Sequence, residues 1–169
     1  MTIVRARYWN TSQAAHHYLR TFSPTAAHPE RRLWSTDGAP RSLAAASALV
    51  DRASSPRLFY GLLLSPDPTT EDRPRDLDLQ ELTDQTLRAL GRRLGRPLPW
   101  VAAEDHEHGR GRHVHVLAIC PRRLSVPDLV VLRETATVVA CEQRRYRDAL
   151  DSGSSVPVAP EQLLEDLRA

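Results

Sequence analysis

The feature that most constrains this chain is a histidine-rich segment, residues 105–115, that opens directly into the apolar stretch Val116–Cys120. An apolar stretch rich in β-branched residues indicates a strand, so His113 and His115 should project from the same face of that strand. Two imidazoles one strand repeat apart on a sheet face are a natural pair of metal ligands. The segment therefore predicts a strand that carries part of a metal site.

A third metal ligand is expected from the turn before this strand, where both His106 and His108 stand. The residues after the histidine pair disfavour two common metalloenzyme classes. A cupin needs a further histidine well downstream, and no histidine follows His115. A metallo-β-lactamase has an aspartate and a histidine directly after the pair, where this chain has Val116 and Leu117. The predicted metal site therefore belongs to neither class.

The 169 residues, 41% of them hydrophobic and 26% charged, are typical of one globular domain. We expect that domain over residues 1–150, and a linker with a short helix over residues 151–169. No stretch approaches the ~20 apolar residues of a membrane span, and the N-terminus lacks a signal-peptide core. We therefore expect a cytoplasmic protein without a membrane partner. Cys120 and Cys141 form no Cys-x-x-Cys pair and are predicted to be buried free thiols.

Every one of the 23 basic residues is an arginine, and the formal net charge is +2. A GC-rich coding bias explains the choice of arginine over lysine. Arginine also suits the recognition of phosphate groups, because its guanidinium forms paired hydrogen bonds. The net charge is too small to establish a nucleic-acid partner, so that prediction depends on motifs.

Alternation and apolar spacing predict five strands and four helices. The strands are expected at 3–8, 33–34, 57–64, 100–104 and 113–120. The helices are expected from Thr11 or Ser12 through Leu19, from Ser42 to about Val50, from 78 to 94, and from 125 to 150. The long last helix should bury one apolar face, made of Leu129, Leu132, Ala136, Val139, Tyr146 and Leu150. The predicted fold class is α+β, with a mostly antiparallel sheet of four or five strands and helices packed on one face.

His113-Val114-His115 resembles the histidine-hydrophobe-histidine motif of the HUH endonucleases, in the relaxase, or mobilisation nuclease, branch. His106 precedes the pair by seven residues, which is the spacing of the third histidine in that family. Trp100–Glu104 resembles the strand that leads into the motif. Arg57–Pro66 resembles the apolar upstream strand that ends in Ser-Pro. The resemblance covers roughly residues 1–140, although the segment between the histidines lacks the family's Asp-x-x-His-Pro run.

The resemblance implies a nuclease that nicks one DNA strand and joins a tyrosine to the 5′ phosphate, in mobilisation of a plasmid or another mobile element. It implies single-stranded DNA at an origin-like site as substrate, with accessory mobilisation proteins as possible partners. His106, His113 and His115 would hold a divalent ion (Mg, Mn or Zn), with His108 as an alternative third ligand.

The nucleophile of relaxases lies near the N-terminus, on the helix after the first strand, which is the position of Tyr18. Other HUH branches place the tyrosine after the histidine motif, where Tyr146 stands. Tyr8 and Tyr60 lie in predicted strands and are interpreted as packing residues. Tyr146 falls on the predicted apolar face of its helix, where a core role is favoured. Tyr18 is therefore the predicted nucleophile.

Neighbouring charged side chains complete the predicted site. Asp105 or Glu104, and also Glu107, could accept the tyrosine proton or orient a histidine. Arginines at positions 110 and 112 could grip flanking phosphates, and Arg20 is a further candidate DNA contact. Two alternatives stay open: a degenerate relaxase-like domain that binds DNA without cutting it, and a histidine-ligated zinc protein unrelated to DNA.

Overall fold

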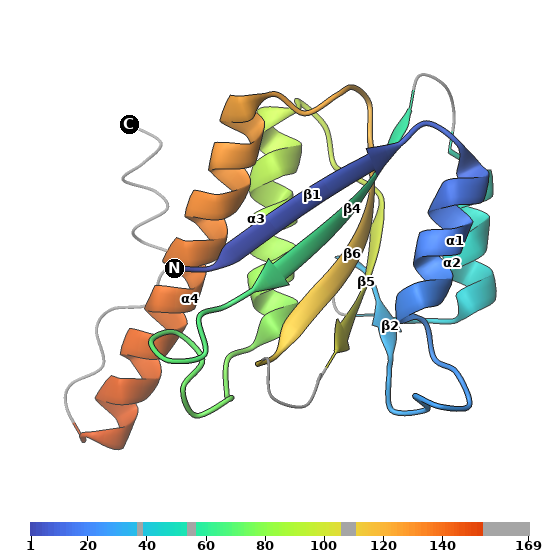
Figure 1. Cartoon of the computed structure of the whole chain (residues 1–169). Coiled ribbons are helices and arrows are strands. Elements are labelled where there is room, and N and C mark those ends of the chain that lie inside the picture. Colours follow the sequence, from blue (N-terminus) through green and yellow to red (C-terminus); the bar gives the residue numbers. More distant parts are fainter. Residues whose placement is uncertain (37–38, 54–56, 106–110, 154–169) are drawn as a thin grey trace.

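The computed structural model describes residues 1–36, 39–53, 57–105 and 111–153. Within these residues it has six strands and four α-helices (Figure 1). In chain order they are β1 (Ile3–Trp9), α1 (Ser12–Phe22), β2 (Leu33–Trp34), β3 (Pro40–Arg41), α2 (Leu43–Asp51), β4 (Leu58–Ser65), α3 (Leu79–Arg93), β5 (Trp100–Asp105), β6 (His113–Cys120) and α4 (Val126–Asp151).

The strands form one sheet in the order β1-β4-β6-β5-β2-β3, and every neighbouring pair is antiparallel. The predicted α+β class and antiparallel sheet are confirmed. All five predicted strands form, and the two-residue β3, which pairs with β2, adds a sixth that was not predicted. The long strands β4, β6 and β5 each have a neighbour on both sides, and the apolar runs of β4 and β6 are buried along most of their length.

Helices cover both faces of the sheet. Figure 1 shows α3 and α4 on one face and α1 and α2 on the other. This differs from the prediction that the helices pack on one face only. The physical reason is that β4 is apolar on both sides: Leu62 and Leu64 alternate with Phe59 and Gly61, and all four are buried. A strand buried on both faces needs a covering layer on each. We call the side of the sheet that carries α1 and α2 the α1 face.

An N-cap and an apolar stripe fix α1 on the sheet. The Thr11 side chain accepts a hydrogen bond of 3.3 Å from a backbone N–H in the first turn, so the helix begins where the sequence predicted. Ala15, Leu19 and Phe22 are buried, at helical spacing. Tyr18, one position from this stripe, is half-buried and packs against the core. The helix therefore presents Tyr18 at the edge of its contact with the sheet.

Only part of the predicted apolar face of α4 is buried. Leu132, Ala136 and Val139 are buried, but Tyr146 is 46% exposed and Leu150 is 51% exposed. Figure 1 shows the C-terminal turns of α4 extending past the sheet, so these side chains have no layer to pack against. The predicted core role of Tyr146 is therefore wrong.

Cys120 and Cys141 are free thiols as predicted, although only Cys120 is fully buried. The part of the chain that the structure describes contains no helix long and apolar enough to cross a membrane. The division at residue 150 stays a prediction, because residues 154–169, with the predicted terminal helix, lie outside the described ranges.

Candidate metal site and its tyrosine

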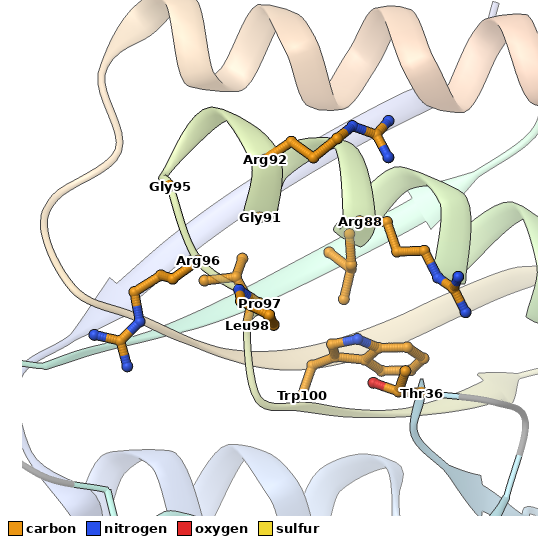
Figure 2. Close-up of a pocket in the computed structure, with 10 residues that line it drawn as sticks. Thr36, Arg88, Gly91, Arg92, Gly95, Arg96, Pro97, Leu98 and Trp100 are labelled. Carbon is orange, nitrogen blue, oxygen red and sulfur yellow. The ribbon is translucent and has the colours of Figure 1, made fainter. Parts of the chain in front are cut away.

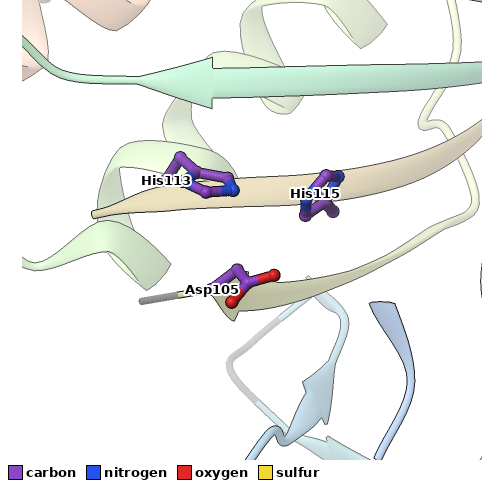
Figure 3. Close-up of side chains that lie close together, drawn as sticks. All are labelled: Asp105, His113 and His115. Carbon is purple, nitrogen blue, oxygen red and sulfur yellow. The ribbon is translucent and has the colours of Figure 1, made fainter. Parts of the chain in front are cut away.

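His113 and His115 project side by side from β6 on the α1 face, as strand alternation predicts. Their ring centroids are 5.0 Å apart. Asp105, at the end of β5, pairs in register with His113. One ligand atom from each of the three side chains can be chosen so that all three atoms lie within 4.8 Å of one another (Figure 3). Two imidazoles and a carboxylate at this separation can hold a divalent ion.

Arg31 is the partner of Asp105, and the sequence prediction missed it. Its Nη2 donates to Asp105 Oδ2 at 2.5 Å, and the two side chains are only 11% and 12% exposed. Its Nη1 donates to the carbonyl of Thr21 at 3.0 Å, while its buried Nε has no hydrogen-bond partner within the described residues. A carboxylate has two oxygens, so Asp105 can keep this ion pair and still offer a lone pair to an ion.

The hydroxyl of Tyr18 lies beside the histidine pair, although 97 residues separate it from His115. Its Oη is 3.3 Å from His115 Nδ1 and 3.3 Å from the carbonyl oxygen of Leu62. The ring packs against Trp9, at 5.0 Å between centroids, and edge-on against Phe22 at 5.2 Å. Burial raises the pKa of Tyr18 above its ordinary value of 10. The phenol is therefore held in place and protonated at neutral pH.

The two hydrogen bonds of Tyr18 agree with one tautomer of His115. If the phenol donates to the Leu62 carbonyl, its oxygen accepts from His115 Nδ1–H. A neutral imidazole protonated on Nδ1 has its lone pair on Nε2, which is the form that binds a metal. The ring of His115 is further fixed by stacking on Phe22, with an interplanar angle of 5°. Phe22 and Tyr18 therefore fix the plane of the His115 ring, and in this tautomer Nε2 would be its ligand atom.

Gly61 makes room for this arrangement. A Cβ on Gly61 would lie 2.7 Å from Trp9 Cη2 and 2.8 Å from Tyr18 Cε1. Both rings therefore lie directly on the backbone of β4, where any side chain would displace them. The position of Tyr18 over the sheet depends on this missing side chain.

Tyr18 alone among the four tyrosines of the chain lies beside the histidines. Tyr8 and Tyr60 face the opposite side of the sheet, where their rings are 5.6 Å apart and the Tyr60 hydroxyl accepts a hydrogen bond from the backbone N–H of Leu124. Tyr60 has the packing role predicted for it, whereas Tyr8 is 42% exposed. Tyr146 is on α4, which covers that opposite face.

Two predicted site residues lie on the wrong face. Glu104 pairs in register with Val114 and therefore points away from the α1 face, because neighbouring strand residues alternate. Arg112 Nε donates to Glu104 at 2.7 Å, and its Nη1 donates to the carbonyl of Leu77 at 3.1 Å and contacts Asp72 at 3.3 Å. Glu104 is thus corrected from a catalytic to a structural residue. Arg112 is only 14% exposed, and its Nε and Nη1 donate to groups within the chain, so this side chain is not directed toward the α1 face.

The remaining predicted residues divide into two groups. Arg20 is exposed on α1. Four others lie outside the described residues, so their predicted roles stay predictions: His106, Glu107, His108 and Arg110.

A groove of about 480 Å³ opens next to Tyr18, between β1 and α1, with Arg7, Trp9 and His17 among its lining residues. The described lining contains no carboxylate. Arg5, also on β1, belongs to the same face as His115, because Arg5 pairs with Leu63 and Leu63 pairs with His115. Two strand spacings separate their backbones, about 10 Å. The α1 face thus carries cationic and aromatic side chains beside the histidines.

Comparison of the chain with protein-family models, with curated proteins and with solved structures found no match. The function must therefore be argued from the site itself.

Proposed function

We propose that this protein is a metal-dependent endonuclease of relaxase type, which nicks single-stranded DNA with Tyr18 as the nucleophile. One observation carries the proposal: the Tyr18 hydroxyl lies 3.3 Å from His115 Nδ1, within the histidine pair that carries the resemblance. The resemblance itself requires a tyrosine of the first helix beside that pair.

The donor set suits a divalent ion. Asp105, His113 and His115 would hold it. The role of His106 as a further ligand stays a prediction, because His106 lies outside the described residues. When bound, such an ion supplies Lewis-acid polarisation of the scissile phosphate and stabilises charge on its oxygens. Two imidazoles and a carboxylate suit Mn²⁺ or Zn²⁺, whereas Mg²⁺ prefers sites made of oxygen ligands. The ion pair with Arg31 fixes the position of the Asp105 carboxylate beside the histidines.

The reaction is a transfer of the phosphoryl group to the phenol. Tyr18 Oη attacks phosphorus, a tyrosine–phosphorus ester bond forms, and the bond from phosphorus to the 3′ oxygen breaks. The 3′ oxygen leaves with the proton that the phenol loses, so charge and atoms balance. The packing of Tyr18 between Trp9 and Phe22 supplies the positioning that such a displacement needs.

The groove beside Tyr18 supports DNA as the substrate. Arg5 and Arg7 suit backbone phosphates, and Trp9 offers an aromatic surface for an unpaired base. We therefore assign to these three residues the DNA-binding role first predicted for Arg112. The three side chains share the α1 face of β1, and Arg5 is level with His115 two strands away.

The test is covalent capture of DNA. The protein is incubated with Mn²⁺ and tiled single-stranded oligonucleotides that cover the DNA on both sides of its own gene, and adducts are detected by denaturing gel electrophoresis. An adduct is expected for the wild type and for Tyr146→Phe, the control at an exposed tyrosine, but not for Tyr18→Phe. An adduct that survives in Tyr18→Phe would refute the assignment of the nucleophile.

A second candidate function is a relaxase-like domain that binds DNA and a metal without cutting. The observation that favours it is that the Tyr18 hydroxyl is already engaged by Leu62 and His115, with its pKa raised by burial. In this case no oligonucleotide forms an adduct, but single-stranded DNA binding remains and weakens with salt. Arg5→Gln with Arg7→Gln would then lower the slope of log K against log salt by about 1.4, since each phosphate contact contributes ~0.7.

A further inference from the structure

A second cavity lies at the other end of β5, between that strand and the C-terminal end of α3 (Figure 2). Its volume is about 400 Å³, and Leu87, Leu98 and Trp100 give it apolar walls. Figure 2 shows the indole of Trp100 across the cavity from α3. The cavity is separate from the histidine site, because Trp100 begins β5 whereas Asp105 ends it, and the two side chains point to opposite faces of the sheet.

The end of α3 fixes the shape of this cavity. The backbone N–H of Arg96 donates to the Gly91 carbonyl at 3.0 Å, and that of Gly95 donates to the Arg92 carbonyl at 3.1 Å. Together with the positive φ of 73° at Gly95, these bonds form a Schellman motif. A Cβ on Gly91 would lie 3.0 Å from the Arg96 carbonyl oxygen, so the chain folds back directly onto the helix there. The cavity is therefore preformed rather than opened by side-chain movement.

Three arginines are among the lining residues of the cavity: Arg88, Arg92 and Arg96. Figure 2 shows Arg88 and Arg96 on opposite sides of the cavity, whereas the side chain of Arg92 points away from Trp100. Arg88 pairs with Asp84 at 2.5 Å, whereas Arg92 and Arg96 are exposed and form no ion pair within the described residues. No carboxylate belongs to the described lining. The site thus combines apolar walls with the exposed positive charge of Arg96 at its edge.

We propose that this cavity binds a planar aromatic anion: a ring system with a carboxylate or phosphate group, of up to nucleotide size. The apolar walls and Trp100 suit the ring, because pockets of about 300–1,000 Å³ with apolar walls and a few polar groups are typical ligand sites. The exposed guanidinium of Arg96 would hold the anionic group at the rim. A bare inorganic anion gains nothing from the apolar walls, and an uncharged ring gains nothing from the arginines.

The test measures binding to the intact chain by isothermal titration calorimetry, with 2-naphthoate, uncharged 2-naphthalenemethanol, inorganic phosphate and AMP as probes. We expect 2-naphthoate to bind at least about tenfold more tightly than the alcohol, and inorganic phosphate not to bind measurably. AMP distinguishes the two sources of such a ligand: binding as tight as that of 2-naphthoate identifies a nucleotide site, and weaker binding identifies an aromatic acid site.

The location is tested with charge-matched variants. Arg96→Glu should weaken 2-naphthoate binding by at least about tenfold. Arg73→Glu changes the net charge equally at an exposed arginine elsewhere and should leave the affinity unchanged. In NMR spectra, 2-naphthoate should shift the indole N–H signal of Trp100 and not that of Trp9.

Equal affinity for 2-naphthoate and its alcohol would overturn the proposal. Equal loss of affinity in Arg96→Glu and Arg73→Glu, or an unshifted Trp100 signal, would do the same. None of these readouts depends on Tyr18 or on DNA cleavage, so the proposal and the nuclease assignment stand or fall separately.

Discussion

Replacing Gly61 with alanine tests whether the backbone of β4 positions Tyr18. The new Cβ would lie 2.7 Å from Trp9 Cη2 and 2.8 Å from Tyr18 Cε1, too close for either ring to stay in place. The two rings pack on each other at 5.0 Å, and Tyr18 is blocked on its other side by Phe22. The clash therefore cannot be relieved by moving one flexible group. Overpacking of this kind costs about 1–3 kcal/mol.

Whether Gly61→Ala stabilises or destabilises the protein shows whether the new Cβ clashes with the two rings. Gly61 is not among the glycines with positive φ, so alanine is allowed by the backbone and without a clash would stabilise the protein by about 0.4–1 kcal/mol. We expect a loss of about 1–3 kcal/mol in the free energy of unfolding from urea titration, together with loss of the DNA adduct. Trp9→Leu, which shortens one of the two clashing side chains, should recover part of the loss in the double variant. A Gly61→Ala protein at least as stable as the wild type would refute the reasoning.

The histidines, Arg31 and the first turn of α4 each give a further expected outcome. His115→Gln should weaken Mn²⁺ or Zn²⁺ binding in calorimetry by at least about tenfold, whereas His17→Gln, at an exposed histidine of α1, should not; equal affinities would exclude His115 as a ligand. Arg31→Met leaves the Asp105 carboxylate buried without its partner and should cost on the order of 3 kcal/mol in urea titration with EDTA present, and a cost near zero would contradict the ion pair. The Arg122 guanidinium, with the Ser125 backbone N–H and hydroxyl, holds the pKa of Asp128 well below its ordinary value. A carboxyl whose folded pKa is depressed stabilises the fold above about pH 4 and loses this contribution as the pH falls toward the folded pKa. Asp128→Asn should therefore flatten the fall in stability between pH 5 and pH 2, and an unchanged slope would contradict this role.

Much of this fold follows from local sequence signals. Thr11 caps α1 as its residue type predicts, and alternation places His113 and His115 on one face of β6. The position of Tyr18 beside them follows from the family resemblance rather than from periodicity. Tyr18 is half-buried because its ring packs on Trp9 of β1 and lies against the backbone of Gly61 in β4.

The errors arise where tertiary register decides. Glu104 and Asp105 are neighbours in sequence, but the pairing of β5 with β6 places only Asp105 on the face of the histidines. Alternation places Glu104 and Asp105 on opposite faces of β5. It leaves open which of them shares the face of the histidines, because that depends on how β5 pairs in register with β6. Arg31 comes from a segment without periodicity and reaches Asp105 because β2 pairs with β5 just beyond it. Tyr146 has the right spacing for a buried face, yet the sheet ends before α4 does.

The central claim is that Tyr18 becomes joined to DNA, and the most direct measurement is mass spectrometry of the adduct after tryptic digestion. Tyr18 falls between Arg7 and Arg20, in one peptide with Tyr8, so fragment ions must assign the nucleotide to one of the two tyrosines. We predict a metal-dependent nucleotide 5′-phosphate on Tyr18. Attachment to Tyr8, Tyr146 or Tyr60, or to a residue that is not a tyrosine, would contradict the account.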